Sequence, residues 1–336
     1  MLIQKKITVT ENGVKKRVSI YGHTEAEVRR KAAAYKTEVA RGPVFDDVLY
    51  AWQEAHFPDL AYGSQQMYKA ASNHLLDFFS GERLAEIRPL EIKRMFEVLK
   101  KQGYSSRTVK AVKTMLGMVY SFAVIDLDLD VTVPSVPVPR GLPVSKRDLP
   151  SDEDIEKIKN SGDPFMLFLL YTGCRRGEAL AVKWSDIDFD SRMVSISKIL
   201  TFENNRGVIH ERTKTAAGRR SIFLLPPLEA VLEPLRGSPD SFVFMPHPFK
   251  ESEFRAFWRR SCESVGVSVT PHQLRHAYAT ILFDAGVDEK VTQELMGHSD
   301  ISLTRDVYTH IRESRMEAER ARIEKTLNVL TLPQSS

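Results

Sequence analysis

The residues best suited to chemistry lie between positions 270 and 310. Thr270 is a favoured N-cap and Gln273, three residues on, completes a capping box, so a helix is predicted to begin here. His272 and Arg275 are then three residues apart on one face of that helix, near the end where backbone N–H groups are unpaired. The spacing predicts two donor side chains that point the same way.

Further donors follow at the end of the next predicted helix. Gly286 is expected to end the first helix, Asp288 to cap the second, and Gly297 to end it. His298 comes directly after that end, and Tyr308 follows a short helical segment later. Taken alone, the same pattern fits a helix-turn-helix DNA-binding motif, in which the two histidines only cap or pack.

A second candidate arginine follows the apolar segment at residues 164–171. On a helix that begins near Cys174, Arg175 and Glu178 are three residues apart, so the carboxylate can orient the Arg175 guanidinium. Arg176 points to another side of the same helix. Arg175 is therefore the better candidate for a site.

In these motifs the chain resembles the tyrosine recombinases of the phage integrase family. Any one short motif arises by chance, but five motifs in the family's order carry weight. The matches are the arginine box TGxRxxE at Thr172, Gly173, Arg175 and Glu178, the HxxR box at His272 and Arg275, the GH box at Gly297 and His298, the YxH ending at Tyr308 and His310, and a hairpin lysine in a TKT turn at Lys214. The resemblance implies that the catalytic set is Arg175, Lys214, His272, Arg275, His298 and Tyr308, with Glu178 in support.

The residue types themselves suit transfer of a DNA strand. A phosphodiester is anionic and its ester oxygen is a poor leaving group, so the reaction needs cations on the nonbridging oxygens, a nucleophile and an acid. Arg175 and Arg275 can each donate two hydrogen bonds to the phosphate, and His272 and His298 add donors for the developing charge. Tyr308, whose phenol ordinarily has a pKa of about 10, would be activated by this cationic pocket and form a 3′-phosphotyrosyl bond.

A general acid and a reversible step complete the predicted mechanism. Lys214, placed by the resemblance, is the candidate acid for the departing 5′-hydroxyl. Without the resemblance, a lysine in a turn is an ordinary solvated charge. Because the ester energy is kept in the phosphotyrosyl bond, a second DNA end can reverse the step, so neither a cofactor nor a metal is expected.

Two other functions use parts of the same pattern. A type IB topoisomerase would apply similar chemistry to one strand, although a basic N-terminal segment favours assembly at defined sites. A DNA-binding regulator would use only the helix-turn-helix-like segment, but it has no need of a tyrosine beside the arginines and histidines. A site-specific recombinase that integrates or excises a prophage or another mobile element therefore fits best.

Length and composition bound the architecture. A chain of 336 residues with 42% hydrophobic residues suggests two or three domains with real cores, and no apolar run is expected to reach the length of a membrane span. The lack of a secretory signal and the presence of only Cys174 and Cys262 predict a cytoplasmic protein without disulfides or a zinc site. The fold class is expected to be mainly α with small β-sheets (α+β).

The positive charge is concentrated at the N-terminus. The formal net charge is +4, whereas residues 1–42 hold ten Lys and Arg against four Asp and Glu, which is +6 and leaves −2 for the rest. Two alternating strands around Asn12-Gly13, followed by a helix with a capping pair at Thr24 and Glu27, predict a small ββα module. It resembles a reduced arm-type DNA-binding domain, with Lys15, Lys16 and Arg17 as DNA contacts; a solvated basic face is the alternative.

Residues 43–130 are expected to form a helical, core-binding (SAM-like) domain. Helices are predicted at 45–57, 64–79, 89–101 and 106–124. The last two carry basic residues that could grip DNA phosphates, although charged helix faces usually meet only water. The candidates are Arg88, Lys93, Arg94, Arg107, Lys110 and Lys113.

A linker, a catalytic domain and a tail complete the expected order. Residues 131–150 hold five prolines and predict an extended linker, which would let two domains clamp double-stranded DNA. Residues 151–310 form the predicted mixed α/β catalytic domain, with strands at 193–200, 207–212 and 219–225 joined by two hairpin turns. Residues 311–336 are a tail that in this family docks on a neighbouring protomer. Expected partners are therefore a homotetramer on synapsed DNA and accessory DNA-bending or excision factors, with no membrane.

Overall fold

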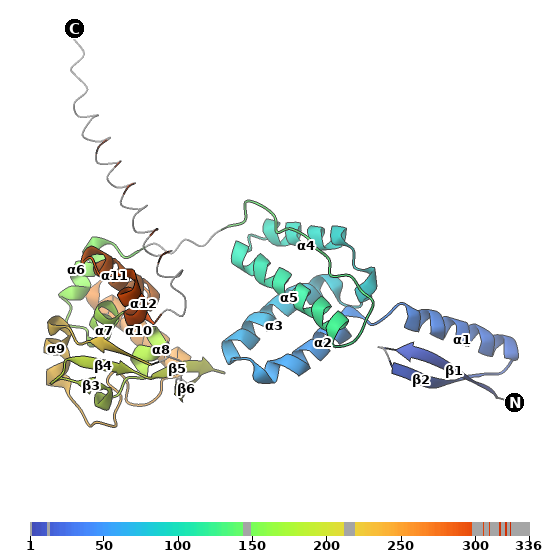
Figure 1. Cartoon of the computed structure of the whole chain (residues 1–336), viewed down its shortest axis with the longest axis horizontal. Coiled ribbons are helices and arrows are strands. Elements are labelled where there is room, and N and C mark those ends of the chain that lie inside the picture. Colours follow the sequence, from blue (N-terminus) through green and yellow to red (C-terminus); the bar gives the residue numbers. More distant parts are fainter. Residues whose placement is uncertain are drawn as a thin grey trace, which may run out of the picture. The chain divides into compact units, whose positions relative to one another are not determined.

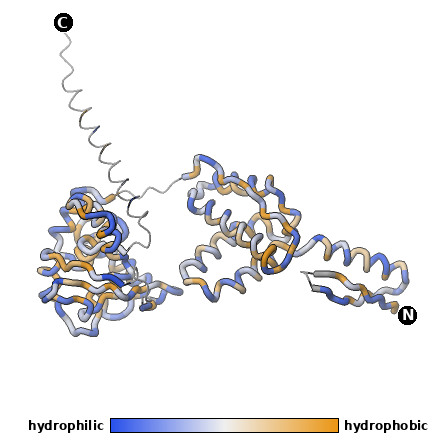
Figure 2. The backbone as a smooth tube through the Cα atoms, in the orientation of Figure 1, coloured by the Kyte–Doolittle hydropathy of each residue, from blue (hydrophilic) through white to orange (hydrophobic). Residues whose placement is uncertain are grey.

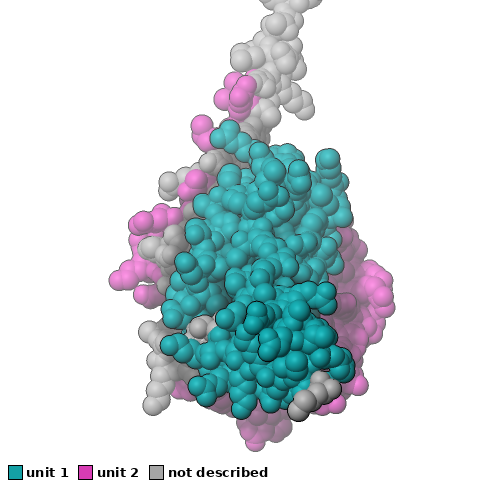
Figure 3. All heavy atoms as spheres, turned by 90° about the vertical axis from the view of Figure 1, so that its right-hand side faces the viewer, with its two compact units in different colours: residues 1–146 teal, residues 147–336 magenta. Residues whose placement is uncertain are grey.

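The chain folds into two compact units. The computed structural model describes residues 2–11, 14–143, 149–211 and 219–297, together with the single residues 305, 309, 316, 320 and 323. Residues 1–146 form one unit and residues 147–336 the other (Figures 1 and 3). Each unit combines helices with small antiparallel sheets, and hydrophobic segments lie within each one (Figure 2). The expected α+β class is confirmed.

The first unit begins with a two-stranded sheet covered by a helix. Strands β1 (Ile3–Glu11) and β2 (Val14–Gly22) pair antiparallel, and helix α1 (Glu25–Ala40) follows. Thr24 caps α1, as predicted, by accepting a hydrogen bond from the backbone N–H of Glu27. A small core joins sheet and helix, built from Ile7, Val9, Val18, Ile20, Ala32, Tyr35 and Val39. The ββα module is therefore confirmed, while the Asn12-Gly13 turn lies outside the described residues.

Four helices form the larger part of the first unit. They are α2 (Phe45–His56), α3 (Tyr62–Phe79), α4 (Pro89–Lys101) and α5 (Ser106–Ile125), with 3₁₀ turns η1 (Phe57–Asp59) and η2 (Leu84–Glu86) between them. The four predicted helices are confirmed within a few residues at each end. Helix α5 begins at Ser106, as predicted, and Ser105 caps it by accepting a hydrogen bond from the Thr108 backbone N–H.

Helix α5 corrects one expectation drawn from composition. It is long and apolar enough to cross a membrane by length and hydropathy alone. However, eight of its residues are buried against the other helices of the module. A helix that is apolar on most sides is either a membrane span or the centre of a folded core, and the packing of α5 against α2 and α3 is of the second kind.

The predicted linker is partly built into the helical module. Residues 129–139 have no regular secondary structure, as expected. Val136 and Leu142 are nevertheless buried in the helical core, and the carbonyl of Pro143 accepts a hydrogen bond from the Ser106 backbone N–H at 2.8 Å. The segment up to Pro143 is therefore a strap on the helices rather than a free connector, and residues 144–148 lie outside the described residues.

The second unit surrounds a nearly apolar helix with helices and two small sheets. The helices are α6 (Asp152–Lys159), α7 (Pro164–Thr172), α8 (Arg176–Leu180), η3 (Trp184–Asp186), α9 (Pro226–Leu232), η4 (Glu233–Leu235), α10 (Glu251–Val265), α11 (Pro271–Asp284) and α12 (Glu289–Met296). The strands are β3 (Ile187–Asp188), β4 (Met193–Ile196), β5 (Lys198–Glu203), β6 (Arg206–Glu211) and β7 (Arg220–Phe223). Helix α7 is buried along almost its whole length and packs on α11.

The strand pairing differs from the sequence-based prediction. The segment at 193–200 was expected to be one strand, but it divides into β4 and β5, which belong to different sheets. Strands β5 and β6 form the predicted hairpin, with Asn204 and Asn205 at positive φ in its turn. The expected second hairpin is wrong, because β7 pairs with β4 in the order β3-β4-β7 instead of pairing with β6. The break near Ser197 lets the chain leave one sheet and enter the other.

Helix α8 is held against β5 by a close backbone approach at Gly177. A Cβ atom at this position would collide with the carbonyl oxygen of Leu200 and touch the side chain of Ile199. Both residues are in β5, so the strand backbone itself would have to move to make room for the Cβ. Gly177 therefore fixes how near α8, which follows Arg175, can lie to the sheet.

Gly177→Ala is expected to destabilise the second unit by about 1–3 kcal/mol, the usual cost of forcing an extra carbon into a packed interior. The measurement is urea-induced unfolding followed by circular dichroism. Gly117→Ala in α5 is the matched control, because nothing lies within 4 Å of the added Cβ. This control should be neutral or gain about 0.5–1 kcal/mol from helix propensity. Equal behaviour of the two variants would contradict the close approach.

Candidate active site

Arg175 and Glu178 are locked together at the start of α8. Arg175 is the N-cap of this helix, and the helix begins two residues later than the sequence suggested. The Glu178 carboxylate accepts hydrogen bonds from the Arg175 backbone N–H at 2.9 Å and from its Nη1 at 2.9 Å. The carboxylate is fully buried, whereas the Arg175 side chain remains 38% exposed. A buried acid thus holds an arginine whose far side reaches solvent.

Arg176 does point elsewhere, as predicted. Its guanidinium lies over the rings of Phe202 and Phe254, at 4.9 and 5.0 Å from their centroids. Burial lowers the pKa of Arg176 from its ordinary value. This arginine therefore braces α8 against β5 and α10 instead of joining the site.

Arg275 is buried more deeply than Arg175. It lies on α11, is only 4% exposed, and donates from Nη1 to the carbonyl of Gly173 at 2.5 Å and from Nη2 to that of Met296 at 2.6 Å. Burial, with the positive charge of Arg175 as the next contribution, lowers the pKa of Arg275 to about 9. It remains a cation at neutral pH, so a second guanidinium charge is buried beside the first.

A third arginine, Arg220, completes the cluster and was not predicted. It is the first residue of β7, its side chain is 6% exposed, and its Nη2 donates to Glu178 Oε2 at 2.8 Å. Its Nε donates to the carbonyl of Leu295 at 2.8 Å. The strand's alternation is the signal that could have found it, because Arg220 is in phase with the fully buried Ile222.

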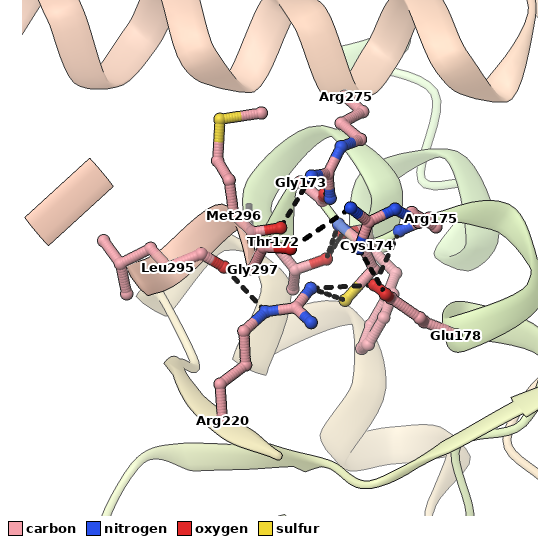
Figure 4. A network of polar contacts seen from close by, with 11 residues as sticks. Thr172, Gly173, Cys174, Arg175, Glu178, Arg220, Arg275, Leu295, Met296 and Gly297 are labelled. Carbon is pink, nitrogen blue, oxygen red and sulfur yellow. Dashed lines mark hydrogen bonds and ion pairs between the residues drawn. The ribbon is translucent and has the colours of Figure 1, made fainter. Parts of the chain in front are cut away.

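The three guanidinium groups meet at one helix end. The consecutive carbonyls of Leu295, Met296 and Gly297 accept hydrogen bonds from Arg220, Arg275 and Arg175, respectively. Figure 4 shows these groups converging on the end of α12 and on Glu178. The last carbonyls of a helix lack partners within the helix and carry its negative partial charge, so they are suited to receive cations.

Cys174 lies inside this cluster but is not suited to chemistry. It is fully buried, and burial raises the pKa of its thiol to about 11. The thiol is therefore neutral at neutral pH, and its sulfur lies 3.9 Å from Arg220 Nη2 as a weak acceptor. Its role is packing.

His272 has a partner that the sequence analysis did not name. His272 Nε2 lies 3.0 Å from Nε2 of His276, one turn further along α11, and the two rings are nearly perpendicular. In such a contact one ring nitrogen donates and the other accepts, and the tautomers decide which of the two donates. The spacing of four residues on one helix was the available signal.

The predicted site residues fall into two groups. The structure brings Arg175, Glu178 and Arg275 together, and it places the exposed His272 one turn before Arg275 on the same helix. Lys214, His298 and Tyr308 lie outside the described residues, so their roles stay predictions. Within the described ranges no group of three or more His, Cys, Asp or Glu side chains is arranged to hold a metal ion.

The helix-turn-helix alternative accounts for the backbone but not for the side chains. The structure has the two helices α11 and α12 with the predicted turn and caps at Gly286, Asp288 and Gly297. However, Arg275 is buried within the unit, and the end of α12 is bound by arginines. The pair therefore builds the interior cationic site.

The comparisons with known proteins agree with this geometry. Residues 152–315 match the profile of the Phage integrase family. The matched region includes the whole arginine cluster. A tyrosine recombinase XerC-like protein of Caldanaerobacter subterraneus is 28% identical over 363 aligned positions, covering 91% of this chain and 92% of the relative. The region of residues 152–315 belongs to the phage integrase family of tyrosine recombinases.

Other relatives and solved structures extend the likeness over most of this recombinase. The tyrosine recombinase XerA of Pyrococcus horikoshii is 29% identical over 68% of the chain and 79% of the relative. The transposase from transposon Tn916 of Enterococcus faecalis is 24% identical over 82% of the chain and 76% of the relative. The Tn1549 transposon integrase, solved in complex with transposon right end DNA, shares the fold with a TM-score of 0.63 at 22% identity, covering 81% of this chain and 98% of that one. The recombinase is thus a DNA strand transferase with the fold of integrases.

Proposed function

We propose how this site-specific recombinase, which acts in the integration or excision of a mobile element, breaks DNA. Tyr308 attacks the scissile phosphate and forms a 3′-phosphotyrosyl bond, while Arg175 and Arg275 bind the nonbridging oxygens. The observation that supports this proposal most is the convergence of Arg175 and Arg275 beside Gly297, the residue directly before His298. That convergence joins the GH box to the two arginine boxes, whose contact between Arg275 and Gly173 spans 102 positions of the chain.

The arginines suit a phosphate that gains charge during the reaction. A guanidinium carries five N–H groups, so Arg175 can hold Glu178 and Gly297 and still donate to an oxygen anion. Hydrogen bonds from a cation to an anion are roughly twice as strong as neutral ones. The half-exposed Arg175 would meet the phosphate first, with His272 and His298 as further donors.

Lys214 is proposed as the acid for the departing 5′-oxygen. Glu211 and Arg219 are the described residues on either side of the segment that carries Lys214. Their side chains form an ion pair at 3.6 Å. Because the phosphotyrosyl ester conserves the energy of the broken bond, attack by another 5′-hydroxyl can reverse the step. The residues named here would carry out the reaction without a cofactor.

One DNA surface is proposed on the N-terminal sheet. Ile7 and Val9 face α1, and the register places Val18 and Lys16 opposite them on that same side. Lys15 and Arg17 lie on the other face, where Arg17 is opposite Thr8. That outer face also carries Lys6, Ser19, Gln4 and Tyr21, with Gln4 bonded to Ser19 and Tyr21. Lys15 and Arg17 thus lie on a different face of the sheet from Lys16, and the proposal assigns the DNA contacts to Lys15 and Arg17.

A second DNA surface is proposed on α4 and α5. Its basic residues are exposed, and, within the part of the chain that the structure describes, only Arg88 of the six forms an ion pair, with Glu91. The other five are Lys93, Arg94, Arg107, Lys110 and Lys113. Cations without acidic partners are free to neutralise phosphates, which is the main source of affinity for DNA.

Assembly and location complete the proposal. A lambda integrase tetramer bound to a Holliday junction shares the fold with a TM-score of 0.57 at 15% identity, covering 85% of this chain and 90% of that one. We propose a corresponding homotetramer on two duplexes, because four strand exchanges need four tyrosines and each chain offers one Tyr308. We also propose accessory DNA-bending or excision factors and a cytoplasmic location, where the DNA substrate is found.

Replacing both Lys15 and Arg17 with Ala is expected to weaken DNA binding and to flatten its salt dependence. Each lost phosphate contact should reduce the slope of log K against log[salt] by about 0.9. Fluorescence anisotropy with a duplex carrying the ends of the mobile element measures both quantities. Lys16→Ala is the matched control from the other face and should leave the slope unchanged. A slope change as large in this control would overturn the assignment of faces.

Tyr308→Phe is expected to bind DNA normally and to form no covalent adduct, because only the phenol oxygen can attack the phosphate. The test uses a nicked duplex that carries the recombination site, so that cleaved strands cannot be rejoined. Adducts are counted as protease-sensitive bands that survive SDS. An adduct formed by the Phe variant at the wild-type yield would show that another residue is the nucleophile.

Lys214→Ala and Arg275→Ala should separate when the leaving group is changed. A duplex with sulfur at the 5′-bridging position releases a thiolate, which leaves without a proton because a thiol's pKa is roughly 8.5. Arg275→Ala should slow cleavage by about a hundredfold or more. The sulfur substrate should restore most of the rate of Lys214→Ala but little of the rate lost in Arg275→Ala. Single-turnover cleavage measures both. If the sulfur substrate left Lys214→Ala slow, the proton would come from elsewhere.

A further inference from the structure

We propose that Arg220 is a positioning residue for DNA cleavage. It holds the Glu178 carboxylate and the end of α12 where Arg175 and the segment after Gly297 can act on the phosphate. The proposal rests on the proposed role of Arg175 as a phosphate-binding residue. Arg220 itself is not proposed to touch the DNA, because its side chain is 94% buried behind Glu178 and α12.

Arg220 and Arg175 share one carboxylate. Glu178 Oε1 accepts from Arg175 Nη1, and Oε2 accepts from both the Arg175 backbone N–H and Arg220 Nη2. The bond from Arg220 adds a side-chain donor to Oε2, the oxygen that does not bind the Arg175 guanidinium. Without it, Glu178 would lose one of the bonds that hold its last torsion, and the Arg175 guanidinium would be oriented less firmly.

Arg220 also sets the position of the end of α12. Its Nε binds the Leu295 carbonyl, while Nη1 and Cζ lie directly against Gly297. A Cβ on Gly297 would come within 2.7 Å of Arg220 Nη1, in addition to the strain of its φ of +62°. The guanidinium therefore occupies the space where residue 297 would carry a side chain, and it fixes the backbone immediately before His298.

The energetic cost of Arg220 argues for a role in geometry rather than in stability. Among the described residues its Nη1 is a buried donor without a hydrogen-bond partner, which typically costs on the order of 1–3 kcal/mol. It also adds a third positive charge to a cluster with one carboxylate, and buried ion pairs are often no more stable than apolar residues of similar volume. A side chain needed only to fill the interior would carry neither cost.

Action through Glu178 distinguishes this role from direct catalysis. If Arg220 only positions Glu178 and α12, its removal should slow cleavage at saturating DNA and leave the affinity for DNA nearly unchanged. Once Glu178 has been replaced by Gln, further loss of Arg220 should cost less than it does in the wild type, because only its contact with the end of α12 is then left to lose.

The experiment measures adduct formation on the nicked duplex for Arg220→Ala, Arg220→Gln and Arg220→Lys. We expect Arg220→Ala to be about a hundredfold slower, comparable to losing one phosphate donor, with a Kd for DNA within a few-fold of the wild type. Millimolar guanidinium should restore part of the rate of Arg220→Ala and have no such effect on the wild type. Arg220→Lys keeps the charge but lacks the two-sided fork, so it should rescue only partly.

Arg219→Ala is the matched control. Arg219 precedes Arg220 in the chain, but its side chain is 60% exposed and pairs with Glu211 at the surface. Its loss removes the same charge without touching Glu178 or α12, so the wild-type rate is expected. Circular dichroism and thermal unfolding establish that each variant is folded. If Arg220→Ala does not fold, Arg220→Gln and Arg220→Lys take its place in the same comparison.

Three results would overturn the proposal. The first is a cleavage rate for the folded Arg220 variants within about threefold of the wild type. The second is a loss of rate in the double variant equal to the product of the losses caused by the Arg220 variant and by Glu178→Gln. The third is an effect of the Arg220 variants on DNA affinity alone. A wild-type protein that forms no adduct on the nicked site would instead contradict the proposed function, so the two failures are distinguishable.

Discussion

The central constraint on the second unit is that three guanidinium charges gather around one carboxylate, with those of Arg220 and Arg275 buried. Isolated buried charges are very costly, and each must be compensated by opposite charge or by hydrogen bonds. Glu178 supplies the only full negative charge among the groups that the described contacts place in the cluster. The remaining compensation comes from the carbonyls of Gly173, Leu295, Met296 and Gly297, each at a helix end. Partial charges fixed by the fold thus take the place of further acids.

That requirement explains why the surrounding elements pack as they do. Helix α7 ends at Gly173, whose left-handed φ of +61° turns the chain toward α8 and whose Cα lies against the ring of Tyr278 from α11. The same turn exposes the Gly173 carbonyl to Arg275 and places Arg175 at the N-cap of α8. The turn at Gly173 therefore provides the carbonyl that Arg275 binds and also positions the backbone of Arg175. Apolar packing between α7 and α11 then keeps Arg175 and Arg275 at a fixed distance from each other.

The sequence predicted local structure well and long-range pairing less well. Caps at Thr24, Thr270 and Asp288 are local, since a side chain and a backbone N–H within three residues decide them, and they are found as predicted. The partner of β7 is decided instead by which face of the strand fits the core, so pairing by nearest neighbour gave the wrong hairpin. Arg220 was missed for the same reason, because adjacent arginines at 219 and 220 look alike until the strand's buried face is known. Burial of Val136 and Leu142 was hidden by the prolines around them.

The carbonyls that hold the arginines before DNA binds also explain how the site can be ready in advance. A cationic pocket with no acceptors would repel its own parts, and its side chains would turn away toward water. Neutral carbonyls at the end of α12 accept one hydrogen bond from each of the three guanidinium groups, and they bind a cation more weakly than an anion does. Under the proposed function, Arg175 would bind a phosphate through its remaining N–H groups while it keeps its bonds to Glu178 and to the Gly297 carbonyl, so the protein would rearrange little. The carboxylate of Glu178, bonded to both Arg175 and Arg220, would hold the Arg175 guanidinium in its direction during that binding.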